Sequence, residues 1–179
     1  MKPVNPIIYL IGYRCTGKST TGKLLADLLD CPFFDTDRLI EEKYMTTLEE
    51  MVKEKGWDYF RSKERKILSA TGHLSRCVIA TGGGIVLDPE NRTFIRTRGI
   101  CAWLYAETAI LVDRILADVQ NLQSRPRFSN GSLFLETQKM LDLRTPLYRE
   151  LGQININTGC HSPRQAASII KRRLSHVRQ

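Results

Sequence analysis

Short apolar runs alternate with longer stretches of helical periodicity along this chain. The clearest apolar runs are residues 7–11, 78–80 and 100–105, and weaker strand patterns occur at 32–35 and 154–157. Continuous apolar runs of this length are typical of strands that are buried on both faces of a parallel sheet. The alternation of strands and helices therefore predicts an α/β fold with a parallel, doubly wound sheet and a layer of helices on each side.

The predicted helices cover residues 20–30, 38–69, 108–119, 133–143 and 163–176, with another starting at Pro89. Pro146 predicts a helix boundary before a further helix that ends near Leu151. The excursion at 38–69 has a break near Gly56 and is longer than a minimal crossover, so about 36–70 is expected to be a small substrate-binding subdomain. The segment at about 119–132 loses the periodicity and holds Arg125. It is interpreted either as a mobile lid over a phosphate site or as an exposed loop.

The composition is that of an ordinary globular domain. The 179 residues suit one domain over 1–179, and 42% of them are apolar and 26% charged. The net charge of +8 attracts anionic substrates and nucleic acid alike, so it does not choose between them. The basic residues 171–173 near the C-terminus have no interleaved aromatic residues, which favours a role at the end of the last helix over nucleic-acid contact.

The cysteines and the N-terminal segment indicate a cytoplasmic protein. The five cysteines are scattered and form no C-x-x-C pair, which argues against a disulfide framework or a zinc site. The apolar segment near the N-terminus is too short to span a membrane and lacks a signal-peptide cleavage site. We therefore expect neither export nor a membrane partner.

Residues 12–19, Gly-Tyr-Arg-Cys-Thr-Gly-Lys-Ser, fit the phosphate-loop pattern G-x-x-x-x-G-K-[ST]. The alternative is a glycine-rich turn that fits the pattern by chance. The predicted strand and helix on either side make such a coincidence much rarer. Glycines let backbone N–H groups turn around phosphate oxygens, and the N-terminus of the following helix favours the anion. Lys18 is expected at the β- and γ-phosphates and Ser19 on Mg²⁺. The predicted nucleotide-binding residues are Gly12, Arg14, Cys15, Thr16, Gly17, Lys18, Ser19 and Thr20.

Charged residues and glycines follow the next strands. Asp35 and Asp37 are two apart near a strand end, so both carboxylates are expected on one side, in the crevice at the carboxyl edge of the sheet. Three glycines at 82–84 follow another strand, which indicates either a backbone that lies close to a partner or a plain loop. Arg61 and Glu64 share a helix face, and on spacing alone an ordinary surface ion pair is the favoured reading.

Six features in order along the chain resemble the shikimate kinase family. They are the phosphate loop, Asp35-Thr36-Asp37, residues 60–64 (Phe-Arg-Ser-Lys-Glu), residues 81–84 (Thr-Gly-Gly-Gly), Arg125-Pro126 and residues 144–148 (Arg-Thr-Pro-Leu-Tyr). The resemblance runs over nearly the whole chain. It implies a P-loop NTPase fold of the nucleoside-monophosphate-kinase type with a five-stranded parallel sheet. It also implies transfer of the ATP γ-phosphate to the 3-hydroxyl of shikimate, a step in making aromatic amino-acid precursors.

The resemblance further implies a catalytic set and one Mg²⁺ per site. Asp37 hydrogen-bonds the reacting hydroxyl and takes its proton. Lys18 and the lid residue Arg125, which also contacts ATP, stabilise the charge on the transferred group. Ser19 binds the Mg²⁺ directly and Asp35 binds it through water.

For the acid, the resemblance implies that Arg61 and Arg144 hold the shikimate carboxylate, a task suited to the planar guanidinium fork. Glu64 then holds Arg61 or the neighbouring arginines in place, which reverses the reading of the Arg61–Glu64 pair as a surface contact. The glycine triplet, Gly82, Gly83 and Gly84, lets substrate hydroxyls approach the backbone N–H groups.

The chain departs from the family pattern in places. Cys15 stands where many members have glycine, and Asp118, Cys160 and His161 lie where relatives often place arginines that stack on adenine. A kinase of another hydroxylated acid, such as gluconate, is the nearest rival, and a kinase-like sensor without turnover is the alternative from another class. The expected partners are ATP and shikimate, with no nucleic acid, and the protein is expected to be a monomer.

Overall fold

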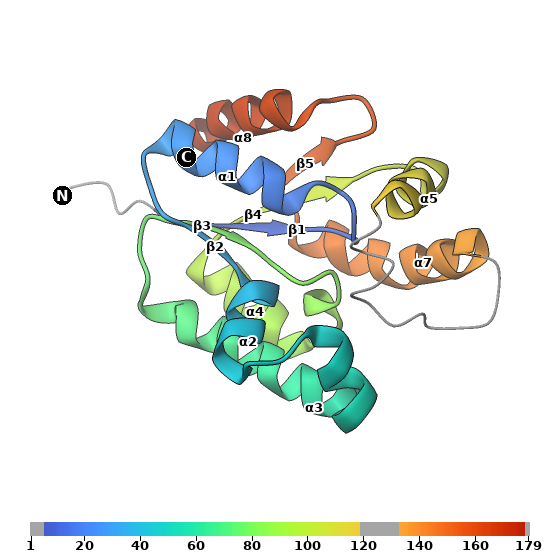
Figure 1. The fold of residues 1–179 in the computed structure, drawn as a ribbon. Helices are drawn as coiled ribbons and strands as arrows, with labels where there is room; N and C mark the ends of the chain where they lie inside the picture. Colours follow the sequence, from blue (N-terminus) through green and yellow to red (C-terminus); the bar gives the residue numbers. More distant parts are fainter. Residues whose placement is uncertain (1–5, 119–132, 178–179) are drawn as a thin grey trace.

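A computed structural model describes residues 6–118 and 133–177 of the chain. Its centre is a five-stranded sheet with the strand order β2-β3-β1-β4-β5, in which every pairing is parallel (Figure 1). The strands are β1 (Ile7–Ile11), β2 (Phe33–Asp35), β3 (Val78–Ala80), β4 (Gly99–Tyr105) and β5 (Ile154–Asn157). The described helices are α1 (Lys18–Leu29), α2 (Thr36–Tyr44), α3 (Leu48–Ala70), α4 (Pro89–Arg98), α5 (Thr108–Ala117), α7 (Leu133–Leu151) and α8 (Pro163–Val177), with short 3-10 turns η1 (Thr71–His73) and η2 (Ile85–Leu87).

Helices cover both faces of the sheet, which confirms the predicted three-layer, doubly wound architecture. Helices α1 and α8 lie on one face, and α4 and α7 lie on the other (Figure 1). Successive residues of β1 alternate between these layers, since Ile8 and Leu10 belong to the core with α1 and α8, whereas Tyr9 and Ile11 belong to the opposite core. All five residues of β1 are buried, which explains why this strand is a continuous apolar run.

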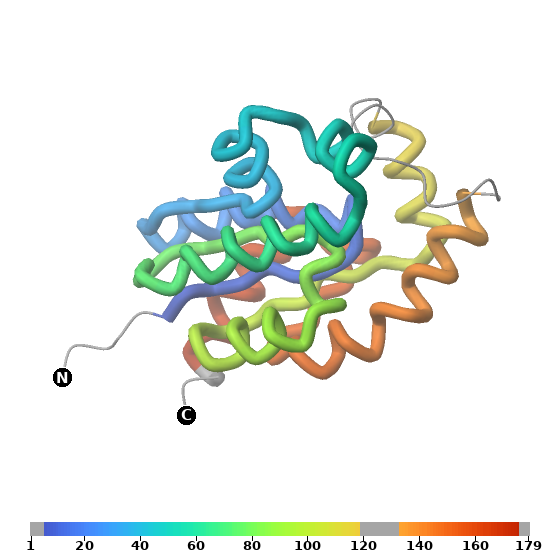
Figure 2. The backbone as a smooth tube through the Cα atoms, turned by 90° about the horizontal axis from the view of Figure 1, so that it is seen from below, coloured from blue at the N-terminus to red at the C-terminus, as the bar shows by residue number. Residues whose placement is uncertain are grey.

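Helices α2 and α3 form the excursion that the sequence predicts between the second and third strands. Figure 2 shows this segment standing out from the sheet. It encloses a small core of its own, made of Ile40, Leu48, Met51, Phe60 and Ile67. A capping box at Thr47 and Glu50 fixes the start of α3. Gly56, with φ 81°, breaks the helix geometry where the sequence predicts a break.

Helix α7 corrects the predicted boundary at Pro146. It runs unbroken from Leu133 to Leu151 with the proline inside it. A proline in a helix removes one backbone hydrogen bond and is normally disfavoured. Here tertiary contacts outweigh that cost, because Arg144 and Tyr148 are one helical turn apart, are 5% and 1% exposed, and both donate hydrogen bonds to the carbonyl oxygen of Gly83.

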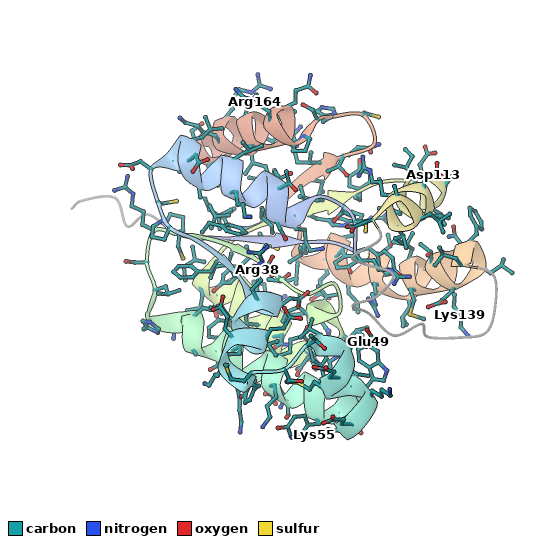
Figure 3. The ribbon with its side chains drawn as sticks, in the orientation of Figure 1. Arg38, Glu49, Lys55, Asp113, Lys139 and Arg164 are labelled. Carbon is teal, nitrogen blue, oxygen red and sulfur yellow. The ribbon has the colours of Figure 1, made fainter. Side chains whose placement is uncertain are left out.

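The basic residues near the C-terminus bind the backbone of the protein itself. Lys171 Nζ donates to the Leu28 carbonyl in the last turn of α1 at 2.9 Å, and Arg173 Nη1 donates to the Asn155 carbonyl at 3.2 Å. Lys171 therefore complements the C-terminus of a neighbouring helix rather than that of its own. Basic side chains are also spread over separate helices, as the labelled Arg164 on α8, Lys55 on α3 and Lys139 on α7 show (Figure 3).

The five cysteines all lie within the described ranges and form no disulfide bonds. Cys77 and Cys101 are buried in the sheet core, as the sequence predicts, and burial raises the pKa of the Cys77 thiol to about 11. Cys15 is partly buried and Cys160 is exposed. Among residues 6–118 and 133–177, none of the helices has the length and apolar character needed to cross a membrane.

Candidate active site

The loop between β1 and α1 turns through three residues with positive φ. Gly12 has φ 144°, and a side chain at this position would collide with the carbonyl oxygen of Leu104 in β4. Gly17 has φ 83° and forms the N-cap of α1. Cys15 has φ 59°, a left-handed conformation that costs a residue with a Cβ about 1–2 kcal/mol. The backbone of the loop is therefore held in a shape that glycine adopts without strain.

The carbonyl oxygen of Tyr13 is the internal anchor of this loop. It accepts hydrogen bonds from Thr16 Oγ1 and from Lys18 Nζ, each at 2.7 Å. Thr16 is buried and, like Gly12, shapes the loop rather than lining the adjacent cleft. The Lys18 ammonium lies beside the loop, where the phosphates of a nucleotide are expected.

Ser19 and Asp35 meet next to the loop. Ser19 Oγ donates to Asp35 Oδ2 at 2.6 Å. The other carboxylate oxygen, Oδ1, accepts from the Asp37 N–H at 3.1 Å, so Asp35 caps α2 and Asp37 lies in its first turn. The start of α2 therefore lies between Asp35 and Asp37. Their proximity was predicted from the alternation of side chains along a strand, and that reason was wrong.

This pair of oxygen donors fits a magnesium ion. A hydroxyl and a carboxylate are hard ligands of the kind that Mg²⁺ prefers, and the ion normally keeps several waters and binds substrate phosphates. Within the described ranges there is no cluster of three or more His, Cys, Asp or Glu residues that could hold a metal alone. Ser19 and Asp35 therefore suit an ion that arrives with a nucleotide.

We call the space around the loop the phosphate cleft; its volume is about 550 Å³. Most of the predicted nucleotide-binding residues line it, namely Arg14, Cys15, Gly17, Lys18, Ser19 and Thr20, together with Asp35 and Asp37. The structure therefore brings the phosphate loop and both acids together.

Arg114 in α5 is a lining residue that the sequence analysis missed. Its guanidinium donates to the Cys15 carbonyl at 3.3 Å and to the Thr158 carbonyl at 2.6 Å, which fixes a cation beside the loop. Asp118, where the family pattern often has an arginine, lines the same cleft one helical turn later. The signal was the spacing of three residues between Arg114 and the buried Leu111, which places both on the same face of α5.

A second space, the acid cleft, lies beside the glycine triplet and is lined by groups from α2, α3 and α7. Its cations are Arg14, Arg61 and Arg144, and its apolar wall includes Trp57 and Phe60. The remaining predicted substrate residues, Asp37, Gly82, Gly83 and Gly84, also line it. An apolar wall with convergent cations suits a small carboxylated ring.

Arg61 is held by Glu64 in a short ion pair, with Nη1 and Oε2 2.6 Å apart. The Glu64 side chain is only 1% exposed, so the pair is not an ordinary surface contact. The Arg61 guanidinium packs directly against Gly84, where an added Cβ would overlap it. Gly84 thus makes room for the arginine, a role that the sequence did not reveal.

Glu64 is a buried carboxylate at the base of the acid cleft. Burial raises the pKa of Glu64, and the Arg61 guanidinium opposes this effect. The Asp37 carboxylate raises it further, because the two acids both face Gly82. A Cβ at Gly82 would lie 2.7 Å from an oxygen of each. The glycine triplet therefore admits the charged side chains of the site as well as any ligand.

Arg144 approaches from α7 on the other side of the triplet. Its Nη1 donates to the Gly83 carbonyl at 3.2 Å, and the Tyr148 hydroxyl donates to the same oxygen. The Arg144 Cζ atom also lies 5.7 Å from the centroid of the Tyr13 ring. This second arginine is thereby fixed relative to both the triplet and the phosphate loop.

The two clefts share Arg14, Asp37 and Leu48 in their walls. A phosphate group in one cleft and a hydroxyl group in the other can therefore meet beside Asp37. Of the predicted site residues, Arg125 lies outside the described residues, and Gly12 and Thr16 lie behind the phosphate cleft. The fold and these two clefts define a P-loop kinase that phosphorylates a small molecule.

Comparison with known proteins gives the family. The family model described as shikimate kinase matches residues 14–175. The shikimate kinase of Syntrophus aciditrophicus is 40% identical over 179 residues, which covers 96% of this chain and 92% of that protein. The chain belongs to the shikimate kinase family and is an ATP-dependent kinase.

Solved structures agree with this assignment. The shikimate kinase from Acinetobacter baumannii in complex with shikimate superposes with a TM-score of 0.89 and 32% identity, covering 98% of this chain and 95% of that one. A gluconokinase from Sinorhizobium meliloti has a TM-score of 0.55 and 14% identity over 97% of this chain and 96% of its own. The latter likeness shows the fold alone.

Proposed function

We propose that this chain transfers the γ-phosphoryl group of ATP to the 3-hydroxyl of shikimate, giving ADP and shikimate 3-phosphate. The observation that carries the proposal is that the phosphate cleft and the acid cleft share Asp37 in their walls. Phosphoryl transfer depends on positioning and on charge stabilisation more than on covalent help, and this arrangement supplies both.

The acid cleft suits shikimate in particular. Shikimate is a ring that carries one carboxylate and several hydroxyls, and the solved relative from Acinetobacter baumannii contains it. Arg61 and Arg144 would bind the carboxylate from two sides, while Trp57 and Phe60 cover the ring. The backbone of Gly82 to Gly84 would receive the hydroxyls.

Asp37 is the residue at which the reaction would occur. Its carboxylate would accept the hydrogen bond of the 3-hydroxyl and then its proton, while the hydroxyl oxygen forms a bond to the γ-phosphorus. The bond from that phosphorus to the bridging oxygen breaks, ADP leaves, and Asp37 returns its proton to solvent. Asp37 lies close enough to Glu64 for each to face Gly82, so the fold fixes its position.

The developing charge would be met by cations around the phosphate cleft. Lys18 would exchange its hydrogen bond to the Tyr13 carbonyl for the β- and γ-phosphates. Two arginines, Arg114 and Arg125 from the segment at 119–132, would further stabilise the negative charge on the transferred group. Magnesium, when bound by Ser19 and through water by Asp35, would neutralise the phosphate charge.

A coupled ADP-release assay tests the proposal. ATP consumption is measured with shikimate, with gluconate and with other hydroxy acids, and without any acid. Strong stimulation by shikimate is expected, and a preference for gluconate would overturn the proposal. If calorimetry showed that shikimate binds but no ADP were released, the alternative of a kinase-like sensor without turnover would be favoured.

The proposal includes a monomer whose partners are only ATP and shikimate. Apart from Arg125, the chain's own described residues supply the groups that the proposed reaction uses in the two clefts, which supports a site within one subunit. Light scattering at micromolar concentration would show one subunit mass. Retention on DNA at physiological salt would contradict the expectation that the protein binds no nucleic acid.

A further inference from the structure

Arg14 has a buried guanidinium whose donors are not all used by the described part of the chain. The residue is 8% exposed. Its Nε and Nη2 atoms are buried and have no hydrogen-bond partner among the residues that the structure describes. Buried charges are normally paired, since an isolated one loses its hydration without compensation. The side chain is therefore arranged for an anion that binds from outside.

The position of Arg14 identifies where that anion binds. Arg14 lines the phosphate cleft and the acid cleft, and it shares this position only with Asp37 and Leu48 among the described lining residues. Arg61 and Arg144 line the acid cleft but not the phosphate cleft, and Lys18 lines the phosphate cleft but not the acid cleft. We call the place where the two clefts share their wall the junction. Among the described residues, Arg14 is the cation that lies there.

The ring of Tyr13 lies close to both Arg14 and Arg144. The Cζ atoms of Arg14 and Arg144 each lie 5.7 Å from the centroid of this ring. Tyr13 is 2% exposed, and its carbonyl is the anchor of the phosphate loop. An aromatic face attracts guanidinium groups, so the Tyr13 ring helps to hold both cations in place.

Under the proposed function, the anion that would occupy the junction is the transferred phosphoryl group. In the proposed function the carboxylate takes Arg61 and Arg144, and the β-phosphate stays with Lys18 and the loop. Only the phosphoryl group leaves one cleft and enters the other. We propose that Arg14 is a catalytic residue that binds this group during transfer and holds it on the phosphorylated acid.

The inference rests on the proposed function and adds no step to it. The bond from the γ-phosphorus to the bridging oxygen breaks, the bond to the acid oxygen forms, and the hydroxyl proton goes to Asp37. Arg14 keeps its protons throughout and contributes N–H donors to the phosphoryl oxygens. Because it is part of the phosphate loop, its charge is in place before the substrates bind.

The test compares the affinities of shikimate and shikimate 3-phosphate, measured by calorimetry without nucleotide at fixed ionic strength. The wild type is expected to prefer the phosphorylated acid. Arg14→Gln should weaken binding of shikimate 3-phosphate by about 10- to 150-fold, the range for a lost charge-assisted hydrogen bond, and change that of shikimate less than about twofold. The turnover number should fall while the KM for shikimate stays the same.

Arg38→Gln is the matched control. Arg38 is exposed on α2 (Figure 3) and lines the phosphate cleft but not the acid cleft. The substitution therefore removes the same charge at a position outside the junction. This variant should keep the preference for the phosphorylated acid. Arg14→Lys, which keeps the charge but loses the fork, should lose about tenfold and carries the test if Arg14→Gln does not fold.

Two outcomes would overturn the inference. Equal weakening of both acids by Arg14→Gln would assign Arg14 to the carboxylate or to the fold. Equal loss of the preference in Arg38→Gln would assign the effect to net charge. Failure of the proposed function has a different signature, because wild-type protein would then release no ADP on addition of shikimate.

Discussion

Replacing Gly84 with alanine should weaken binding of the acid while the protein stays folded. Gly84 has φ −97° and ψ 0°, a conformation open to any L-residue, so the backbone is not strained. The new Cβ would overlap the Arg61 guanidinium, which is the end of a flexible side chain and can move. The arginine would therefore turn away from Glu64 and from the carboxylate position.

The size of the effect follows from the contacts that are lost. A charge-assisted hydrogen bond contributes about 1.5–3 kcal/mol, so the KM for shikimate should rise about 10- to 150-fold. The KM for ATP should stay within about twofold, because Arg61 does not line the phosphate cleft. Glu64 would lose its ion-pair partner, and leaving a buried group unsatisfied costs about 1–3 kcal/mol of stability.

A double-mutant cycle separates this mechanism from simple blockage. The KM for shikimate is measured in wild type, Gly84→Ala, Arg61→Ala and the double variant by coupled ADP release. If the methyl group acts by displacing Arg61, it should have almost no further effect once Arg61 is absent. An equal effect of Gly84→Ala in both backgrounds would refute the reasoning, since the methyl group would then be obstructing the acid itself.

Three other substitutions probe the same site. Asp37→Asn should lower the turnover number at least about 10²-fold with unchanged ATP affinity, and unchanged turnover would remove Asp37 as the base. Arg144→Lys should raise the KM for shikimate, because an ammonium cannot reproduce the fork that also reaches the Gly83 carbonyl; an unaltered KM would count against it. Burial raises the pKa of Glu64 above 4.5, so the native state holds this proton more tightly than the unfolded state. The contribution of this group to the free energy of unfolding is therefore lost as the pH rises from 4.5 through the raised pKa. Glu64→Gln should lack that loss, so urea unfolding from pH 4 to 8 should show the variant gaining on wild type as the pH rises; a constant difference would contradict the assignment.

The sheet and the phosphate loop could be predicted because local pattern and tertiary structure agree there. The strand at 7–11 is apolar throughout because both its faces are covered, and the loop that follows carries its chemistry in consecutive residues. The pairing of Arg61 with Glu64 was also accessible, because residues three apart on a helix must share a face.

Long-range contacts account for what the sequence could not predict. Pro146 lies inside α7 because Arg144 and Tyr148 bind a carbonyl more than sixty residues away in the chain. Likewise, Gly84 makes room for Arg61, a side chain from another element, which composition does not reveal. Propensity sets a local preference, and these buried contacts override it.

A crystal structure with magnesium, a non-hydrolysable ATP analogue and shikimate bound would test the central claim most directly. We expect the triphosphate beside Lys18 and Ser19, the carboxylate on Arg61 and Arg144, and the 3-hydroxyl within hydrogen-bond distance of Asp37. If the ring lay outside the acid cleft, or presented its carboxylate instead of a hydroxyl to Asp37, the account would be contradicted.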